Sequence, residues 1–227
     1  MRPSSALSPT SPALVPVPTH ADPIRLLIIE EHPVTRIGLV AVLRAERDLM
    51  VVGTAADLPG GLELVDRWSP DAVLIDPDLT DSDGPASIRA LRARAPSLRI
   101  IALGQHDGDE EIYRILEAGA CGYLLKSVPP PEIVAAIHEA SAGRACLSPR
   151  ARQRLDERRK WPDLTPRERQ VLALVAEGRS NANIAAVLDI ACGTVKLHIK
   201  AILAKLGVED RGQAALVALR RGFARIG

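Results

Sequence analysis

The sequence predicts a doubly wound α/β domain with a five-stranded parallel sheet, followed by a small all-α domain of four helices. Short apolar runs alternate with helical patterns from Ile24 to about Ala142, which is typical of a parallel sheet covered by helices. Beyond about Asp163 every periodic segment is helical. Charge divides near the same boundary: residues 1–147 hold 13 Lys and Arg against 20 Asp and Glu, and residues 148–227 hold 16 against 8. A basic second domain favours a phosphate-rich partner.

Composition argues against several classes of protein. No apolar run approaches the roughly 18 residues that span a bilayer, so we expect no membrane segment. Aromatic residues make up 2% of the chain, so surfaces that stack single-stranded bases are not expected. The three cysteines, Cys121, Cys146 and Cys192, are odd in number and lack CxxC spacing. This pattern favours a cytoplasmic location without structural disulfides or a cysteine-based metal site.

The predicted elements of the α/β domain follow in order from the N-terminus. Residues 1–22 are rich in Pro, Ser and Thr and lack the apolar core of a signal peptide, so we interpret them as a disordered tail. The first domain, residues 23–147, begins with the strand Ile24–Ile29 and a helix from Val34 to about Arg47. The further strands are expected near Met50–Thr54, Ala72–Asp76, Arg99–Leu103 and Gly122–Leu125, and the further helices near Leu58–Trp68, Ala86–Ala95, Glu110–Ala118 and Pro131–Ala142.

Chemistry in such a sheet is expected where the strands end, because the crevice there is open and flanked by helix N-termini. The residues at these ends are Glu30, Glu31, Asp76, Gly104 and Lys126. Carboxylates hold a hard cation such as Mg²⁺, an aspartate can attack phosphorus, and a lysine neutralises transferred charge. The set predicts a Mg²⁺-assisted phosphoryl-transfer pocket.

The second domain is predicted to cover residues 163–227, after a charged, solvated linker over residues 148–162. Thr165, Pro166 and Glu168 form a capping box with proline at the first helical position, and Gly178 ends that helix. Three more helices are expected over Asn183–Leu188, Thr194–Leu206 and Gln213–Arg221.

A short helix, a turn and a longer helix form the helix-turn-helix arrangement, whose second helix enters the major groove of duplex DNA. In that helix Val195, Ile199, Ile202 and Leu206 face the core, which leaves Lys196, Leu197 and Lys200 outward. Two lysines and an aliphatic side chain suit guanine acceptors and a thymine methyl group. Thr194 and Arg179 are placed to contact phosphates. The alternative is that the two lysines only solvate an amphipathic helix.

This region resembles the C-terminal domain of NarL/LuxR-type regulators in Leu164–Leu172, in Leu188-Asp189-Ile190 and in Thr194–Val208. The resemblance implies that Lys196, Leu197 and Lys200 contact base edges of promoter DNA. It also implies a homodimer on DNA through the last helix, Ala214–Arg221, where the apolar residues are Leu216, Val217 and Leu219.

The helix start at Ala191-Cys192-Gly193 departs from that family, which commonly has Ser, Thr or Glu as the cap. Loss of the side-chain cap costs roughly 1 kcal/mol. We interpret Cys192 as a small turn residue, and a redox-sensing thiol is the alternative.

The α/β part resembles the receiver domain of two-component response regulators, which have a flavodoxin-like fold. The matching features are Glu30-Glu31-His32-Pro33, the run ending in Asp76, Asp83-Gly84, and Gly122–Lys126. The resemblance implies phosphorylation at Asp76 by a sensor histidine kinase, Lys126 as support, Tyr123 as an aromatic switch, and Mg²⁺ held by the acidic residues. Those residues are Glu30, Glu31, Asp76 and Asp78. RNA polymerase is a further candidate partner.

Four departures from the receiver pattern bear on control by phosphorylation. Both residues of the acidic pair are Glu, Pro77 removes a backbone N–H beside the acceptor, and Thr80 stands where proline is usual. Gly104 takes the place of the Ser or Thr hydroxyl that grips the phosphoryl group. The alternative function is therefore a phosphorylation-independent transcription factor whose receiver serves dimerisation or the binding of a ligand or protein.

An enzyme is the remote alternative. Asp76, Asp78 and Thr80 match the DxDxT motif of haloacid-dehalogenase-type phosphatases. Those enzymes place this motif on an early strand, before their metal-binding acidic pair, whereas here the pair comes first. We therefore expect a regulator and not an enzyme.

Overall fold

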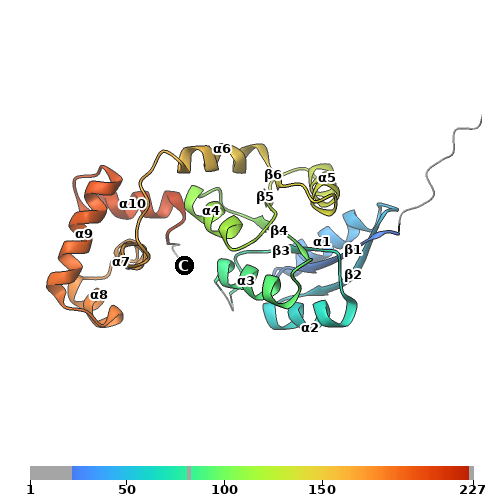
Figure 1. The fold of residues 1–227 in the computed structure, drawn as a ribbon, viewed down its shortest axis with the longest axis horizontal. Helices are drawn as coiled ribbons and strands as arrows, with labels where there is room; N and C mark the ends of the chain where they lie inside the picture. Colours follow the sequence, from blue (N-terminus) through green and yellow to red (C-terminus); the bar gives the residue numbers. More distant parts are fainter. Residues whose placement is uncertain (1–21, 81–82, 225–227) are drawn as a thin grey trace, which may run out of the picture.

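The computed structural model describes residues 22–80 and 83–224, so the predicted tail lies, but for residue 22, outside the described residues. An α/β domain and a helical domain lie side by side along the long axis of the molecule (Figure 1). No helix among the described residues is long and apolar enough to cross a membrane.

A parallel sheet forms the centre of the α/β domain, with strand order β2-β1-β3-β4-β5-β6. This confirms the predicted doubly wound fold, although the sheet has six strands and not the expected five. The additional strand, β6, has only two residues, which is too short for an apolar run to reveal it. The strands are β1 (Ile24–Ile29), β2 (Leu49–Ala55), β3 (Ala72–Ile75), β4 (Arg99–Gly104), β5 (Gly122–Leu125) and β6 (Cys146–Leu147).

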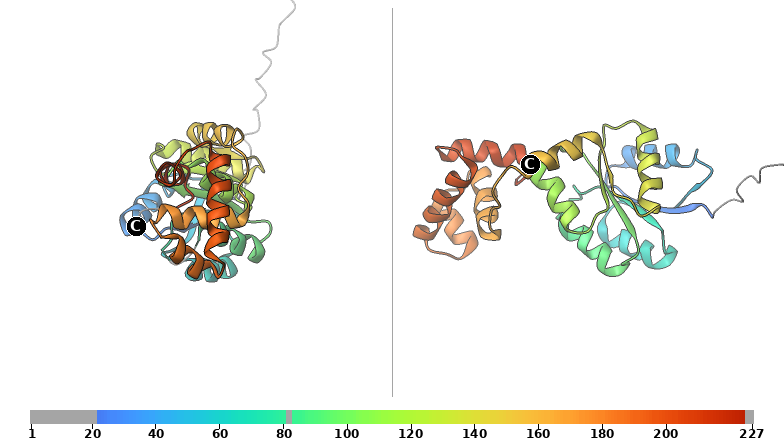
Figure 2. Two further views of the ribbon diagram at one scale, coloured as in Figure 1. Left: turned by 90° about the vertical axis from the view of Figure 1, so that its left-hand side faces the viewer. Right: turned by 45° about the horizontal axis from the view of Figure 1, so that its top comes forward.

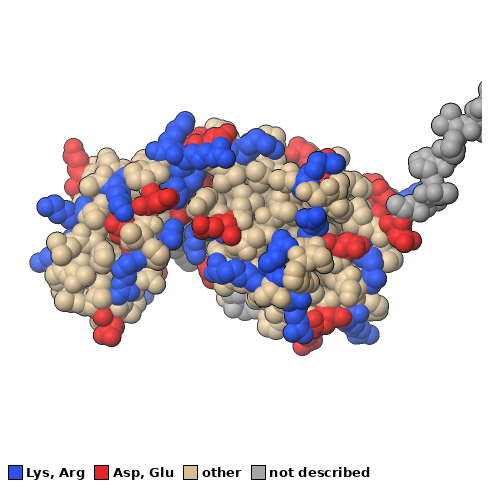
Figure 3. All heavy atoms as spheres, in the orientation of Figure 1, with Lys and Arg blue, Asp and Glu red and all other residues tan. Residues whose placement is uncertain are grey.

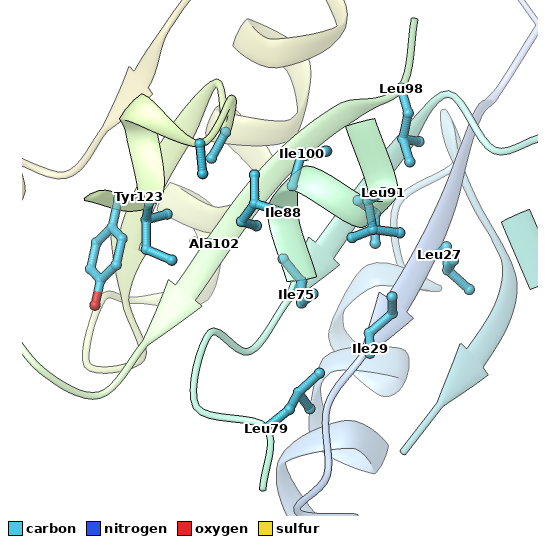
Figure 4. Close-up of a cluster of buried hydrophobic side chains, with 14 of the residues drawn as sticks. Leu27, Ile29, Ile75, Leu79, Ile88, Leu91, Leu98, Ile100, Ala102 and Tyr123 are labelled. Carbon is cyan, nitrogen blue, oxygen red and sulfur yellow. The ribbon is translucent and has the colours of Figure 1, made fainter. Parts of the chain in front are cut away.

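Two apolar clusters cover the two faces of the sheet. Side chains of α1 and α5 pack on one face, and those of α2, α3 and α4 pack on the other, where Figure 4 shows the buried aliphatic residues and Tyr123. Nearly every core residue is aliphatic, as the composition predicts. The helices are α1 (Pro33–Leu43), α2 (Leu58–Trp68), α3 (Gly84–Arg94), α4 (Asp109–Glu117) and α5 (Pro130–Ser141).

The segment predicted as a solvated linker contains a packed helix, α6 (Pro149–Arg158). Ser148 caps it by accepting a hydrogen bond from the N–H of Ala151. Ala151 is fully buried against the apolar cluster that contains the side chains of α2, α3 and α4. Leu155 packs on the same cluster. Only two apolar residues, Ala151 and Leu155, mark the buried face among the fifteen residues 148–162, of which eight are charged. Two such residues do not form an apolar stripe, so the sequence pattern indicated a solvated linker.

Four helices make up the second domain, as predicted, around a core of aliphatic residues. The capping box is confirmed: Thr165 accepts from the N–H of Glu168, and Glu168 accepts from the N–H of Thr165. Ala191 precedes the longest helix without a side-chain cap. The helices are α7 (Pro166–Ala176), α8 (Asn181–Leu188), α9 (Cys192–Leu206) and α10 (Arg211–Arg221).

The C-terminal end of α10 contacts the N-terminal end of α4 (Figure 2). Buried Arg221 pairs with Asp109 at 3.1 Å, and buried Arg158 of α6 donates to Glu110 at 2.5 Å. Gly108 permits this approach, because a Cβ there would lie 2.8 Å from the carbonyl group of Arg221. Ion pairs therefore stabilise the contact between the domains, and the lack of a side chain at Gly108 allows the two helices to approach closely.

Candidate functional site

Three strand ends bring the predicted pocket residues together. Glu30 follows β1, Asp76 follows β3 and Lys126 follows β5, and parallel strands end at the same edge of a sheet. The ammonium Nζ of Lys126 lies 2.6 Å from Oδ2 of Asp76 and 2.7 Å from Oε2 of Glu30. Both carboxylates are almost fully buried. The edge thus holds two acidic groups and one cation in direct contact.

His32 joins this cluster, although sequence reasoning did not assign it a role. Its Nδ1 lies 2.9 Å from Oε1 of Glu30 and 3.8 Å from Oδ2 of Asp76. Glu30, His32 and Asp76 together have the spacing of a metal-binding group. The signal that could have indicated His32 is its position directly after the acidic pair, where α1 begins.

The other two predicted metal ligands, Glu31 and Asp78, border this group, but their ligand atoms are not among those that come together in it. Glu31 accepts hydrogen bonds from the N–H and the hydroxyl of Thr80, at 2.8 and 2.6 Å. The N–H of Asp78 donates to Oδ1 of Asp76 at 3.0 Å. It therefore supplies to the Asp76 carboxylate a backbone donor of the kind that Pro77 cannot offer.

Burial and ion pairing shift the pKa values of Asp76, Glu30 and Lys126 in opposite directions. Burial raises the pKa of Asp76 above its ordinary value, and the hydrogen bond from Lys126 only partly offsets this effect. Burial also raises the pKa of Glu30, but hydrogen bonds from Lys126 and His32 outweigh it, so the net shift is downward. The pKa of Lys126 is raised, because its bonds to both carboxylates outweigh burial. The ammonium therefore stays charged and compensates the acidic pair.

The donor set fits a hard divalent cation. Two carboxylates that face one another offer the oxygen ligands that Mg²⁺ takes in proteins, and the imidazole of His32 suits it less well. Asp76 and Glu30 are therefore the residues that would hold the ion.

Gly104 ends β4 beside the side chain of Tyr123, which is fully buried (Figure 4). A Cβ at Gly104 would lie 2.2 Å from the hydroxyl oxygen of Tyr123. That hydroxyl donates to the carbonyl of His106 at 2.7 Å and lies 3.3 Å from Oε1 of Glu111. The tyrosine ring thus occupies the inward position, in space that any larger residue at 104 would take.

The outward face of α9 carries the three residues predicted to read bases. Lys196 and Lys200 are exposed, and Leu197 is 70% exposed. The opposite face is fixed in the core through Val195 and Ile202, which are 0% and 1% exposed. This helix lies on the side of its domain away from the sheet (Figure 1), and Figure 3 shows Lys and Arg side chains projecting from that domain into solvent.

Thr194 and Arg179, predicted to contact phosphates, lie in different elements: Thr194 is part of α9, and Arg179 comes just before α8. Thr194 is half-buried in the first turn of α9. Arg179 is exposed and lies 3.2 Å from the Glu177 carboxylate. Both side chains are at least partly accessible to solvent.

The residues of the predicted dimer helix differ in exposure. Leu216 is 58% exposed on α10, whereas Val217 and Leu219 are half-buried. The latter two line a cavity between the domains, together with Gln105 and Trp161. Of the three, only Leu216 is freely presented to a second chain here.

Two family models match the chain. Residues 26–138 match the response regulator receiver domain, and residues 162–218 match the luxR family of bacterial regulatory proteins. These spans correspond to the two domains of the structure.

Proteins of similar length and known structures agree with that match. The chain is 35% identical over 208 residues to the nitrate/nitrite response regulator protein NarL of Escherichia coli K12, covering 87% of this chain and 96% of that protein. It is 38% identical over 205 residues to the transcriptional regulatory protein LiaR of Bacillus subtilis 168, covering 87% and 97%.

Among solved structures, one of the response regulator ChrA from a heme-sensing two-component system has 33% identity and a TM-score of 0.54, covering 89% of this chain and 100% of that one. One of RcsB dimers bound to DNA has 25% identity and a TM-score of 0.66, covering 88% and 99%. The chain therefore belongs to the two-component response regulators that join a receiver domain to a LuxR-type DNA-binding domain.

Proposed function

We propose that this protein binds promoter DNA as a homodimer, with one α9 helix in the major groove of each half-site. The observation that supports this most directly is the exposed group of Lys196, Leu197 and Lys200 on a helix whose other face is fixed in the core. The RcsB structure, in which dimers are bound to DNA, supports the same arrangement. Two half-sites about one helical turn apart would match the two-fold symmetry.

Each exposed side chain has a specific role in this proposal. Lys196 and Lys200 donate to the O6 and N7 acceptors of guanine, and Leu197 contacts a thymine methyl group. Thr194 and Arg179 bind phosphate oxygens, which fixes the position of the helix without reading sequence.

Substitution of Lys200 tests the assignment of α9. Lys200→Ala should weaken binding to a selected site by about 1–3 kcal/mol and relax base preference at one position. Lys160→Ala, which removes an exposed lysine outside the helical domain, serves as the matched control. The measurement is fluorescence anisotropy on the selected duplex and on single-base variants of it. Wild-type affinity in a Lys196→Ala, Lys200→Ala double variant would refute the recognition role of α9.

For the receiver, we propose that Asp76 accepts a phosphoryl group from a sensor histidine kinase or a small phosphodonor. An oxygen of the Asp76 carboxylate forms a bond to phosphorus, while the bond from phosphorus to the donor breaks and the donor takes the electron pair. Lys126 is placed to neutralise the transferred charge, since its Nζ already lies 2.6 Å from the carboxylate. Mg²⁺ held by Asp76 and Glu30 would offset the charge of the incoming phosphoryl oxygens.

Phosphorylation is only weakly coupled to DNA binding in this proposal. A receiver switches when a hydroxyl moves toward the phosphoryl group and leaves space for the aromatic side chain. Gly104 supplies no hydroxyl, and Tyr123 already fills that space. A ligand that makes no differential contact with two states cannot shift the equilibrium between them.

RNA polymerase is the remaining partner in this proposal, as the target of the DNA-bound dimer.

A further inference from the structure

We propose that Cys121 and Cys146 form a reversible redox site, in which a peroxide converts the two thiols into a disulfide. The site lies at the edge of the sheet where β6 pairs with β5, apart from the Asp76 pocket and the DNA-binding face. It involves neither phosphoryl transfer nor DNA contact, so it stands independently of the function proposed above.

The backbone places these two cysteines next to one another. The N–H of Cys146 donates to the carbonyl of Cys121 at 3.1 Å, and neighbouring strands of a sheet lie about 4.7–4.9 Å apart. A disulfide requires Cα atoms about 4.4–6.8 Å apart. Cys146 pairs in register with Gly122, the residue directly after Cys121, so the two cysteines occupy adjacent positions on neighbouring strands. Both side chains pack in the same apolar cluster. A Cβ at Gly122, between them, would lie 2.1 Å from Sγ of Cys146, so the absence of a side chain there leaves room for the thiol.

The two thiols have unequal surroundings: Sγ of Cys146 lies 3.9 Å from the carbonyl oxygen of Cys121, and Sγ of Cys121 donates to the carbonyl of Ile100 at 3.2 Å. A hydrogen bond from Cys146 lowers the pKa of the Cys121 thiol to about 7, and burial opposes this effect. The positive charges of Arg99 on β4 and Arg92 on α3 lower it further. The pKa of Cys146 is raised, first by the same hydrogen bond and then by burial, with a smaller contribution from Glu139 of α5.

The thiol with the lower pKa is also the more accessible one. Cys121 is partly exposed, whereas Cys146 is 5% exposed. Redox-sensing cysteines are typically thiolates that solvent reaches, beside a second cysteine that resolves the first oxidation product. Cys121 fits the first role and Cys146 the second. Cys192, considered above as a redox-sensing thiol, is exposed but has no cysteine neighbour among the described residues.

The reaction balances with one peroxide. The Cys121 thiolate attacks one oxygen of hydrogen peroxide, the O–O bond breaks, and the other oxygen leaves as hydroxide, which takes a proton to become water. The sulfur of Cys146 then attacks the sulfenic sulfur of Cys121, forming the S–S bond and releasing the second oxygen as water. Two electrons pass from the sulfurs to the peroxide, and a thiol reductant reverses the change.

The disulfide would fasten β6 to the sheet at the start of the connection between the domains. Ser148, directly after β6, donates its N–H to the carbonyl of Tyr123 at 3.2 Å and caps α6. Oxidation therefore fixes the residues from which α6 begins.

Intact mass and peptide mapping of the full chain after treatment with hydrogen peroxide test the proposal. The expected product has lost about 2 Da, yields one peptide pair joined through Cys121 and Cys146, and returns to the starting mass with dithiothreitol. Cys192→Ser should behave as wild type. Cys146→Ala should instead hold Cys121 as a sulfenic acid that dimedone traps, and Cys121→Ala should show neither product.

A second measurement needs no cysteine variant. The rate of alkylation of Cys121 in the native protein should rise with pH, with a midpoint near 7, and the midpoint should move upward in Arg99→Gln. The proposal is overturned if peroxide only adds oxygen to wild type without a cross-link between Cys121 and Cys146. It is equally overturned if the disulfide that forms joins two chains through Cys192.

Discussion

Among the four departures from the receiver pattern, the missing side chain at Gly104 is the one that stands beside the predicted aromatic switch, Tyr123. The sequence alone indicates that a hydroxyl is absent, and the structure adds the spatial consequence. Tyr123 lies so close that a Cβ at residue 104 would fall 2.2 Å from its hydroxyl oxygen. The inward tyrosine and the glycine are therefore linked, since a side chain at residue 104 would collide with the tyrosine ring where it lies.

Substitution of Gly104 should expose this dependence. Gly104→Ala should lower the free energy of unfolding by about 1–3 kcal/mol, because the added methyl group displaces Tyr123 from its buried hydrogen bonds. The double variant Gly104→Ala, Tyr123→Leu should recover part of that loss, because it removes the clashing ring. Urea denaturation of wild type, of the single variants Gly104→Ala and Tyr123→Leu and of the double variant measures both values. Equal stability of Gly104→Ala and wild type would show that the ring moves outward without cost.

Residue types at strand ends could be predicted from the sequence, but their partners could not. Glu30, Asp76 and Lys126 were expected at one edge because parallel strands end together. Glu31 belonged to the same expectation, yet its carboxylate binds Thr80, and His32 lies in its place beside Glu30. The direction of a side chain depends on the loop that follows the strand, and no periodic pattern records that direction.

At the scale of elements, the periodic patterns predicted the helices and strands well where those elements are long. The patterns identified α2 and β5 at their observed bounds and placed the other long elements to within a few residues. They missed β6, which has two residues, and the packing of α6, whose buried face is marked only by Ala151 and Leu155. Short elements and charged helices depend on tertiary contacts, which a local pattern does not contain.

The start of α7 permits a test of charge against hydrogen-bond geometry. Burial raises the pKa of Glu168, but hydrogen bonds from Lys205 and Thr165 outweigh it and hold the pKa below the ordinary 4.5. A carboxyl group whose pKa is lowered in the folded state stabilises the protein above its unfolded pKa and loses that effect as pH falls through the folded value. We therefore expect the charged Glu168 carboxylate to stabilise the folded protein at neutral pH, and this stabilisation to be lost in acid.

Glu168→Gln keeps an oxygen that can accept from Thr165 but removes the charge facing Lys205. At pH 7 this variant should be less stable than wild type by about 0.5–1 kcal/mol, since Lys205 is partly exposed to solvent. The difference should shrink as pH falls below 4.5. Urea denaturation across pH measures it, with the exposed Glu177→Gln as control. A difference that stays constant with pH would assign the effect to the capping geometry instead.

At the scale of the whole molecule, the contact between α4 and α10 was not predictable from the sequence. The sequence shows that the two domains carry opposite net charge, but it does not show which acidic and basic residues contact one another. In the structure Glu110 lies between Arg158 at 2.5 Å and Arg221 at 3.8 Å, and it is 1% exposed. The α9 residues proposed to read bases take no part in this contact, so the receiver does not cover the proposed DNA-binding face.

Removal of the Glu110 charge should separate the domains without changing DNA recognition. Glu110→Gln leaves buried arginines facing a neutral group, which weakens the contact. Small-angle X-ray scattering should then give a larger radius of gyration than for wild type, whereas affinity for DNA should change less than about tenfold. Glu117→Gln, on the exposed side of the same helix, is the control. A large loss or gain in DNA affinity would contradict the separation of the two surfaces.

The central claim is that phosphorylation of Asp76 is weakly coupled to DNA binding, because Gly104 already lets Tyr123 take the inward position. The most direct test measures affinity for one selected duplex with and without a small phosphodonor and Mg²⁺, for wild type and for Asp76→Asn, with intact mass recording phosphorylation. The account predicts that phosphorylated and unphosphorylated wild type differ by less than about tenfold, roughly 1.4 kcal/mol, and that Asp76→Asn binds nearly as wild type does. A gain of about a hundredfold or more on phosphorylation, abolished by Asp76→Asn, would contradict it.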